Sequence, residues 1–221
     1  SARGTYAGIV EKIPYLKDLG ITAVELMPVT EFDEVMMSSS GNGFHDAKPE
    51  PTGYINYWGY GPSYLYAVKS AYASHGEMSA ESEFKTLVKE LHRAGIECIP
   101  ELYFTGKELP GEIVSVLRYW VEEYHVDGFH LLGFPNLLLA AEDPFLKRTK
   151  LFAENWNEVM DRRPKKGYIT PGDGPVSVAE KNLAEYNMQF MEDMRRFLKG
   201  DEGMLQAFEF RNRRNPAEYA V

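Results

Sequence analysis

Apolar residues recur along the chain at two different periods, which predicts helices and buried strands in alternation. A helical stripe of apolar side chains runs through residues 5–19, with Thr5 as a possible cap and Gly20 as the stop. The run that follows, Ile21–Val29, is short and bounded by Gly20 and Pro28. Such a run predicts a strand that is buried on both faces.

The same alternation continues toward the carboxyl terminus. Further strands are expected at Ser63–Val68, Ile96–Phe104, Val126–Leu132 and Thr149–Asn155. Amphipathic helices are expected after the cap Ser79 and in two later segments. Their apolar residues are Ile113, Leu117, Trp120, Val121 and Tyr124 in the first of these, and Phe190, Met194, Phe197 and Leu198 in the second. Residues 32–61 have no clear period and are predicted to form a long surface loop.

Strands alternating with helices predict a parallel sheet, either open and doubly wound or closed into a barrel. No GxGxxG or GKS/T phosphate loop follows a strand, which lowers the expectation of nucleotide binding and favours a barrel-type enzyme. The chemistry of such a barrel lies at the carboxyl ends of its strands. The residues at these ends are Glu25, Glu101, Leu132 and Glu154.

Composition and charge narrow the possible partners. The 221 residues are 44% hydrophobic with a net charge of -9, values of a soluble globular protein that repels nucleic acid and anionic membrane surfaces. One cysteine, Cys98, cannot form an internal disulfide, so a cytoplasmic location is expected. Fourteen tyrosines and three tryptophans are compatible with stacking on sugars, although aromatic residues also fill cores.

Several long phrases of the sequence resemble the α-amylase superfamily of glycoside hydrolases, in particular its isoamylase and glycogen-debranching branch. The phrases are GTYAGIVEKIPYLKDLGITAVELMPVTEFDE, NYWGYGPSYLYA, GIECIPELYF, LRYWVEEYHVDGF, DPFLKRTKLFAENW and EYNMQFMEDMRRFLKGDEG. They are collinear and cover nearly the whole chain. The resemblance implies one barrel-like domain over residues 1–221, with about six of the eight strand units and no small domain inserted after strand three.

The resemblance also implies a retaining mechanism, which needs two carboxyl groups about 5 Å apart. Where the family reads Gly-Phe-Arg-Phe-Asp on strand four, this chain has His130 at the arginine and Leu132 at the nucleophile. Leucine cannot form a glycosyl-enzyme intermediate, so the chain is expected to be catalytically impaired. The family's strand-three Asp-Val-Val-x-Asn-His begins here with Glu101, and Gly106 replaces its histidine.

Other positions of the family's site are retained. Glu154 matches the acid/base, Tyr60 matches the aromatic that stacks on the sugar, and Trp58 and Trp156 lie beside them. Each position also has a purely structural interpretation. Glu154 could be an acid without a catalytic role, and the aromatic residues could pack under the long loop. His130 suits a base or a ligand, but a lone histidine between apolar neighbours is more often a satisfied core residue.

Three functions follow from this sequence. The first is a non-catalytic domain that binds α-glucan. The second is an active α-glucan glycosidase that pairs Glu154 with Glu101 or Glu25 as a replacement carboxylate. The third is an interaction module that completes its barrel by association, for example as a homo-oligomer. No cofactor is expected, and no HxxxH or CxxC spacing predicts a metal site.

Overall fold

A computed structural model describes residues 2–37, 51–74, 76, 78–133, 137–153, 182–186 and 188–200. The helices are α1 (Tyr6–Val10), α2 (Ile13–Asp18), η1 (Ser70–Tyr72), α3 (Ala80–Arg93), α4 (Pro110–Tyr124), α5 (Leu137–Ala141) and α7 (Met188–Lys199). The strands are β1 (Ala23–Leu26), β2 (Thr30–Phe32), β3 (Val35–Met37), β4 (Pro51–Ile55), β5 (Ser63–Val68), β6 (Glu97–Tyr103), β7 (Gly128–Leu132), β8 (Lys150–Ala153) and β9 (Leu183–Glu185).

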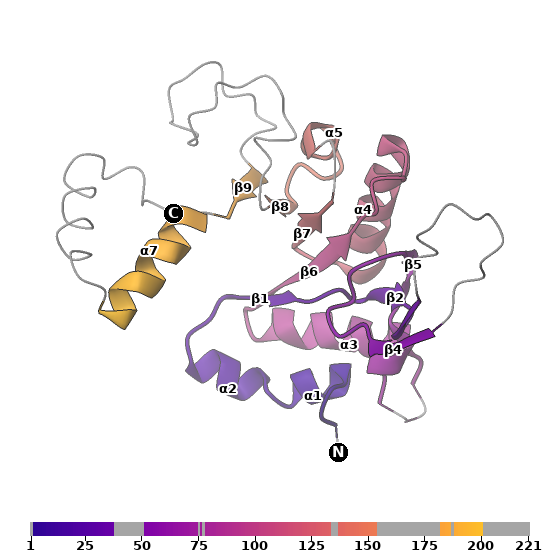
Figure 1. The fold of residues 1–221 in the computed structure, drawn as a ribbon. Helices are drawn as coiled ribbons and strands as arrows, with labels where there is room; N and C mark the ends of the chain where they lie inside the picture. The colour runs from indigo at the N-terminus through magenta and orange to yellow at the C-terminus, as the bar shows by residue number, and fades with distance from the viewer. Residues whose placement is uncertain are drawn as a thin grey trace, which may run out of the picture.

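Five strands form a parallel sheet in the order β1-β6-β7-β8-β9 (Figure 1). Every neighbouring pair is parallel, as expected for strands joined by helical crossovers. The predicted parallel sheet is therefore confirmed, whereas the expected six barrel units and the absence of an inserted domain stay predictions. Residues 104–109 link β6 to α4.

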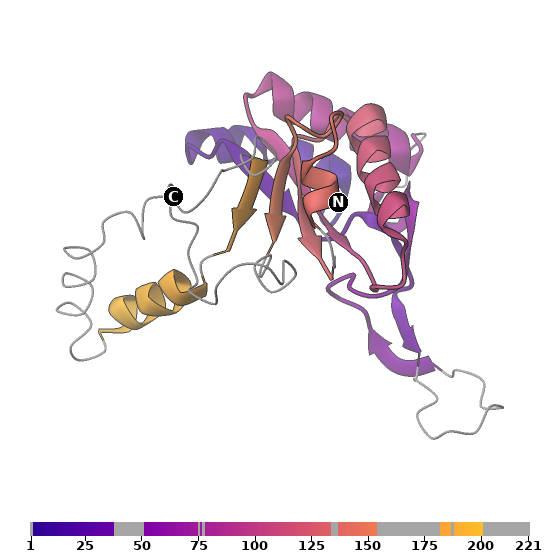
Figure 2. The same cartoon turned by 90° about the horizontal axis from the view of Figure 1, so that it is seen from above.

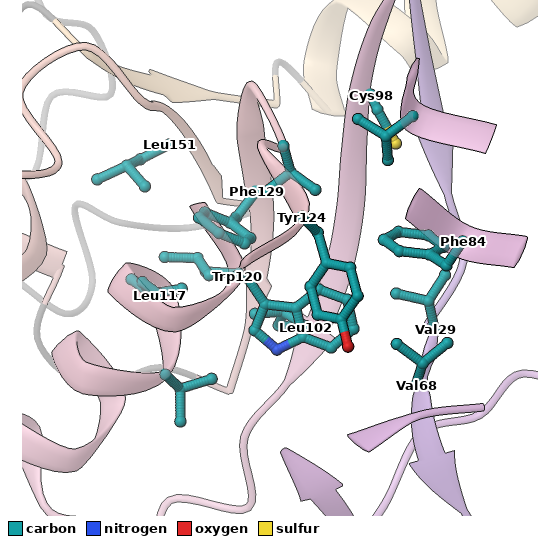
Figure 3. Packing of buried hydrophobic residues seen from close by; sticks show 14 of the residues in the cluster. Val29, Val68, Phe84, Cys98, Leu102, Leu117, Trp120, Tyr124, Phe129 and Leu151 are labelled. Atoms are coloured by element: carbon teal, nitrogen blue, oxygen red, sulfur yellow. The ribbon is translucent and has the colours of Figure 1, made fainter. Parts of the chain in front are cut away.

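The core lies between this sheet and the helices packed on one of its faces (Figure 2). The apolar stripe of α4 places Leu117, Trp120 and Tyr124 against Phe84 of α3 and Phe129 of β7, as Figure 3 shows. Trp120 is completely buried, and its indole N–H donates to the carbonyl of Leu65 at 2.7 Å. The helix-facing side of the sheet is thus occupied by packing, which leaves the opposite face for chemistry.

Three expectations about local structure require correction. The helix predicted over residues 5–19 is divided into α1 and α2, because Pro14 stands in the first turn of a new helix, where a missing N–H is tolerated. The segment Ser63–Val68 is a strand, β5, but it pairs antiparallel with β2 outside the parallel sheet. Residues 32–61 are not only loop, because they contain the antiparallel pair of β3 and β4.

Two helix boundaries follow the sequence signals. The side chain of Thr5 accepts a hydrogen bond from the N–H of Gly8 and caps α1, and Ser79 caps α3 in the same way through the N–H of Ser82. Gly95, with φ of 76°, follows the end of α3. In the described part of the chain, no helix has both the length and the apolarity that a membrane span requires.

Candidate functional site

The alternation of side chains along the strands brings three polar residues to the face that the helices do not cover. Leu102 on β6 and Phe129 on β7 belong to the core, so their neighbours Glu101 and His130 point to the other face. The register pairs Glu101 directly with His130. Glu25 of β1 reaches the same cluster from the far side of β6.

The imidazole of His130 lies between the two carboxylates. Its Nδ1 is 2.8 Å from Oε1 of Glu25 and 3.7 Å from Oε1 of Glu101. His130 is only 5% exposed, and its Nε2 is buried with no hydrogen-bond partner among the described residues. All polar contacts described for this ring therefore go to the two glutamates.

Two tyrosine hydroxyls bind the outer oxygens of the same carboxylates. The hydroxyl of Tyr60 donates to Oε2 of Glu101 at 3.0 Å, and the hydroxyl of Tyr186 donates to Oε2 of Glu25. The ring of Tyr186 also lies 4.6 Å from the ring of His130, with an angle of 30° between the planes. The five side chains form one hydrogen-bonded group, which we call the strand-end cluster.

Charge controls protonation in the strand-end cluster. Burial lowers the pKa of His130, but the hydrogen bonds and charges of Glu101 and Glu25 outweigh it and raise the pKa to about 9. Burial raises the pKa of Glu25, but the hydrogen bonds from His130 and Tyr186 outweigh it, so the net shift is downward. At neutral pH His130 is therefore an imidazolium beside the carboxylate of Glu25.

A row of aromatic rings extends from the cluster to the surface. Tyr60 stacks on Tyr103 with centroids 5.6 Å apart, and Trp58 stacks on Tyr60 at 6.4 Å with an angle of 13° between the planes. Trp58 is 58% exposed and Tyr60 is 40% exposed. Aromatic surface of Trp58 and Tyr60 is thus exposed beside the strand ends, where it could pack on the apolar face of a sugar.

The turn that carries this row is fixed by Asn56 and Gly59. The side-chain oxygen of Asn56 accepts from the N–H of Gly59 at 3.0 Å, and its amide donates to the carbonyl of Tyr60 at 3.1 Å. Gly59 has φ of 77°, and a Cβ there would lie 2.7 Å from the ring of Phe32. Only glycine fits both conditions, so the sequence Trp-Gly-Tyr holds the two rings in place.

Leu132 lies at the carboxyl end of β7, two residues beyond His130 and on the same face of the sheet. The register places it opposite Tyr103. An aliphatic side chain therefore occupies the strand end next to the aromatic row.

The structure thus gathers Glu25, Glu101, His130, Leu132 and the tyrosine and tryptophan of the Trp-Gly-Tyr turn near one another. Glu154 and Trp156, the other predicted site residues, lie outside the described residues. Sequence reasoning missed Tyr186. Its signal was the phrase EYN in the carboxyl-terminal part of the chain, directly after β9.

The sequence is similar to known proteins along most of its length. Residues 1–102 match the family model described as the catalytic domain of α-amylase. The chain is 32% identical to isoamylase 3, chloroplastic, of Oryza sativa subsp. japonica over 279 aligned positions, which include 96% of this chain. It is also 30% identical, over 93% of its length, to a glycogen operon protein GlgX homolog of Haemophilus influenzae. The sequence is thus similar to the α-amylase superfamily, in particular to its isoamylase and glycogen-debranching members.

The fold is also similar to that of a solved glycan-degrading enzyme. Pullulanase type I from Bacillus subtilis str. 168, solved in complex with maltose, matches 87% of this chain with a TM-score of 0.58 and 21% identity. The chain spans about a third of the length of these relatives, 33% of the rice isoamylase and 37% of the GlgX homolog. The match to rice isoamylase extends over 279 residues, more than the 221 of this chain, so that relative has residues without a counterpart here.

Proposed function

We propose that this glycogen-debranching-like domain of the α-amylase superfamily binds α-glucan without hydrolysing it. The observation that carries the proposal is Leu132, an aliphatic residue on the open face of the sheet at the strand end where the family resemblance expects the nucleophile. Without a nucleophilic carboxylate at this point, a retaining glycosidase cannot form its covalent intermediate.

The exposed aromatic row supports glucan binding. Trp58 and Tyr60 are both exposed at the outer end of the stacked row, so their exposed aromatic surface can pack on the apolar face of a glucose unit. The relatives named above include an isoamylase and a pullulanase solved with maltose, which points to α-glucan rather than another polysaccharide.

The state of the remaining carboxylates argues against the alternative of an active glycosidase. A replacement nucleophile must present a free oxygen to the substrate. Both oxygens of Glu25 are already bonded, one to His130 and one to Tyr186, and Glu101 contacts His130 and Tyr60. Neither Glu25 nor Glu101 would therefore be available as the second carboxylate that Glu154 needs for hydrolysis.

Calorimetry with maltoheptaose tests the binding. We expect binding by the unaltered chain to weaken at least about tenfold, or 1.4 kcal/mol, in Trp58→Ala and Tyr60→Ala. Tyr60→Phe keeps the ring but loses the hydroxyl that donates to Glu101, so it is expected to retain glucan binding. Tyr15→Ala, an exposed tyrosine on α2, is the matched control and should bind normally. Absence of heat with the unaltered chain would refute glucan binding.

A reducing-sugar assay separates the binding domain from an active glycosidase. We expect no release above buffer from glycogen, maltoheptaose or a branched dextrin. Release that is abolished by Glu154→Gln would instead establish the alternative in which that residue works with another carboxylate.

Association is a second candidate role, and the sheet edge favours it. In the described part of the sheet, β1 is an edge strand without a partner on its outer side, a feature that invites pairing with another chain. Light scattering tests this role directly. A dimer or larger assembly at micromolar concentration is expected if strands pair between copies, and a monodisperse monomer would exclude self-association.

A further inference from the structure

We propose that Glu25, Glu101 and His130 form a binding site for a divalent transition-metal ion such as Zn²⁺. One possible ligand atom from each residue lies within 4.8 Å of the other two. Tetrahedral ligands at the usual zinc bond lengths of about 2.1 Å are separated by about 3.4 Å. The distances from Nδ1 of His130 to the two Oε1 atoms, 2.8 and 3.7 Å, lie on either side of this value. The two distances from Nδ1 thus differ from the value for a shared ion by no more than about 0.6 Å.

The three ligands stand on a rigid base. They come from β1, β6 and β7, which are consecutive in the parallel sheet. The register places Glu101 opposite His130, while Glu25 lies on the strand at the other side of β6. A site built on neighbouring strands keeps its ligands in place with little loss of entropy upon binding.

The second oxygen of each carboxylate is held by a tyrosine. Tyr60 binds Oε2 of Glu101 and Tyr186 binds Oε2 of Glu25, so the Oε1 atoms are the ones turned toward the imidazole. Hydrogen bonds of this kind orient carboxylate ligands around metals in proteins. Each glutamate is thereby prepared to bind an ion through one oxygen.

The burial and the contacts of His130 support a cation at this point. His130 is 5% exposed, and its Nε2 finds no partner among the described residues, so its contacts with protein are directed only at the carboxylates. The ion takes the position of the proton that Nδ1 shares with Glu25.

The donor set selects the kind of ion. One imidazole nitrogen with two carboxylate oxygens suits Zn²⁺, Co²⁺ or Ni²⁺, whereas Ca²⁺ and Mg²⁺ prefer oxygen ligands alone. No short spacing motif marks this site in the sequence, since its ligands come from three separate strands. The proposal favours the ligand alternative for His130 over that of a satisfied core residue.

Equilibrium dialysis of the chelator-treated chain against ZnCl₂ tests the site. We expect one tightly bound ion per chain, with affinity reduced at least about tenfold in Glu25→Gln and in His130→Asn. Glu112→Gln, which removes an exposed carboxylate in the first turn of α4, is the matched control and should bind as the unaltered chain does. Zinc binding of equal strength in all four proteins, or no binding at all, would overturn the proposal.

A second measurement needs no variant and so does not depend on whether a variant folds. Added Co²⁺ is paramagnetic and broadens the NMR signals of the imidazole that binds it. Among the five histidines of the chain, we expect selective broadening of His130. Broadening of His92 or His125 instead, or displacement of Co²⁺ by equimolar Ca²⁺, would contradict the proposed ligands.

Discussion

Removal of the charge on His130 should change how the stability of the metal-free chain depends on pH. The folded chain raises the pKa of this histidine from its ordinary value of 6.5 to about 9. A raised pKa means that the folded state binds the proton more tightly than the unfolded state does. The resulting stabilisation is fully present below about pH 6.5 and is lost as the pH rises through about 9.

The size of this effect follows from the shift. Each pKa unit corresponds to about 1.4 kcal/mol, so a rise from 6.5 to about 9 gives about 3 kcal/mol. This value is an upper bound, because Glu25 is partly exposed and water screens its charge. Urea unfolding in the presence of EDTA, repeated from about pH 6 to about pH 9.5, measures it directly.

Two variants isolate the contribution of His130. His130→Asn keeps an amide near the position of Nδ1 but cannot be charged, and its unfolding free energy should fall less between these pH values. His125→Asn removes an exposed histidine with φ of 56°, a conformation that asparagine tolerates, and should keep the full slope. Burial raises the pKa of Cys98 to about 12, so this thiol also makes stability depend on pH under alkaline conditions. Its contribution is the same in all three proteins and cancels when their unfolding free energies are subtracted. Parallel curves for the unaltered chain and His130→Asn would refute the reasoning.

Three further substitutions test the frame around the site by thermal or urea unfolding. Gly133→Ala should lower the free energy of unfolding by more than about 3 kcal/mol. The backbone φ at this position is 69°, and the new Cβ would lie 2.1 Å from the carbonyl oxygen of Phe104. An unchanged melting temperature would contradict this prediction. Asp143→Asn should lose about 1 kcal/mol at neutral pH. Burial raises the pKa of Asp143, but the hydrogen bond from Arg118 outweighs it and the net shift is downward. The loss should therefore vanish as the pH falls through that lowered pKa, and a loss that does not depend on pH would contradict the prediction. Trp120→Phe should lose about 1–3 kcal/mol, because the partly buried carbonyl of Leu65 on β5 loses its donor. A loss below about 0.5 kcal/mol would count against that bond.

The parts of the fold that could be predicted are those with a strong local signal. β6, β7 and β8 lie within the short apolar runs that predicted them, because strands of a covered parallel sheet are apolar along most of their length. The start of α3 was readable from the cap at Ser79 followed by an amphipathic stripe. In these segments, burial and local backbone preference favour the same structure.

The parts that could not be predicted depend on distant partners. β5 reads as a strand, but nothing local shows that it pairs antiparallel with β2 instead of joining the parallel sheet. β3 and β4 stabilise each other although every described side chain of β4 is exposed, so their sequence has no apolar alternation to detect. Pairing of this kind is decided by backbone hydrogen bonds between segments that are separated in the sequence.

The site shows the same division. Glu25 and Glu101 could be singled out as polar residues at strand ends, a position where parallel sheets place their chemistry. That a single imidazole contacts both of them could not be inferred, because this depends on the lengths of the side chains and on the register of β6 with β7. Tyr186 was missed for a similar reason, since its hydroxyl reaches Glu25 from a strand at the other end of the sheet.

The two departures from the family pattern on β6 and β7 have opposite effects on side-chain length. Glu101 is one methylene longer than the aspartate that the resemblance expects, and His130 is shorter than the expected arginine. These residues lie opposite each other in the register, so the longer acid compensates for the shorter base and the carboxylate still meets a cation, at 3.7 Å. The resemblance also expects a carboxylate at position 132, and no neighbouring residue on β6 or β7 makes up for its replacement by leucine. An acid and a base thus face each other on β6 and β7, whereas Leu132 offers no carboxylate on the same face, an arrangement that supports the proposed binding of a ligand without cleavage.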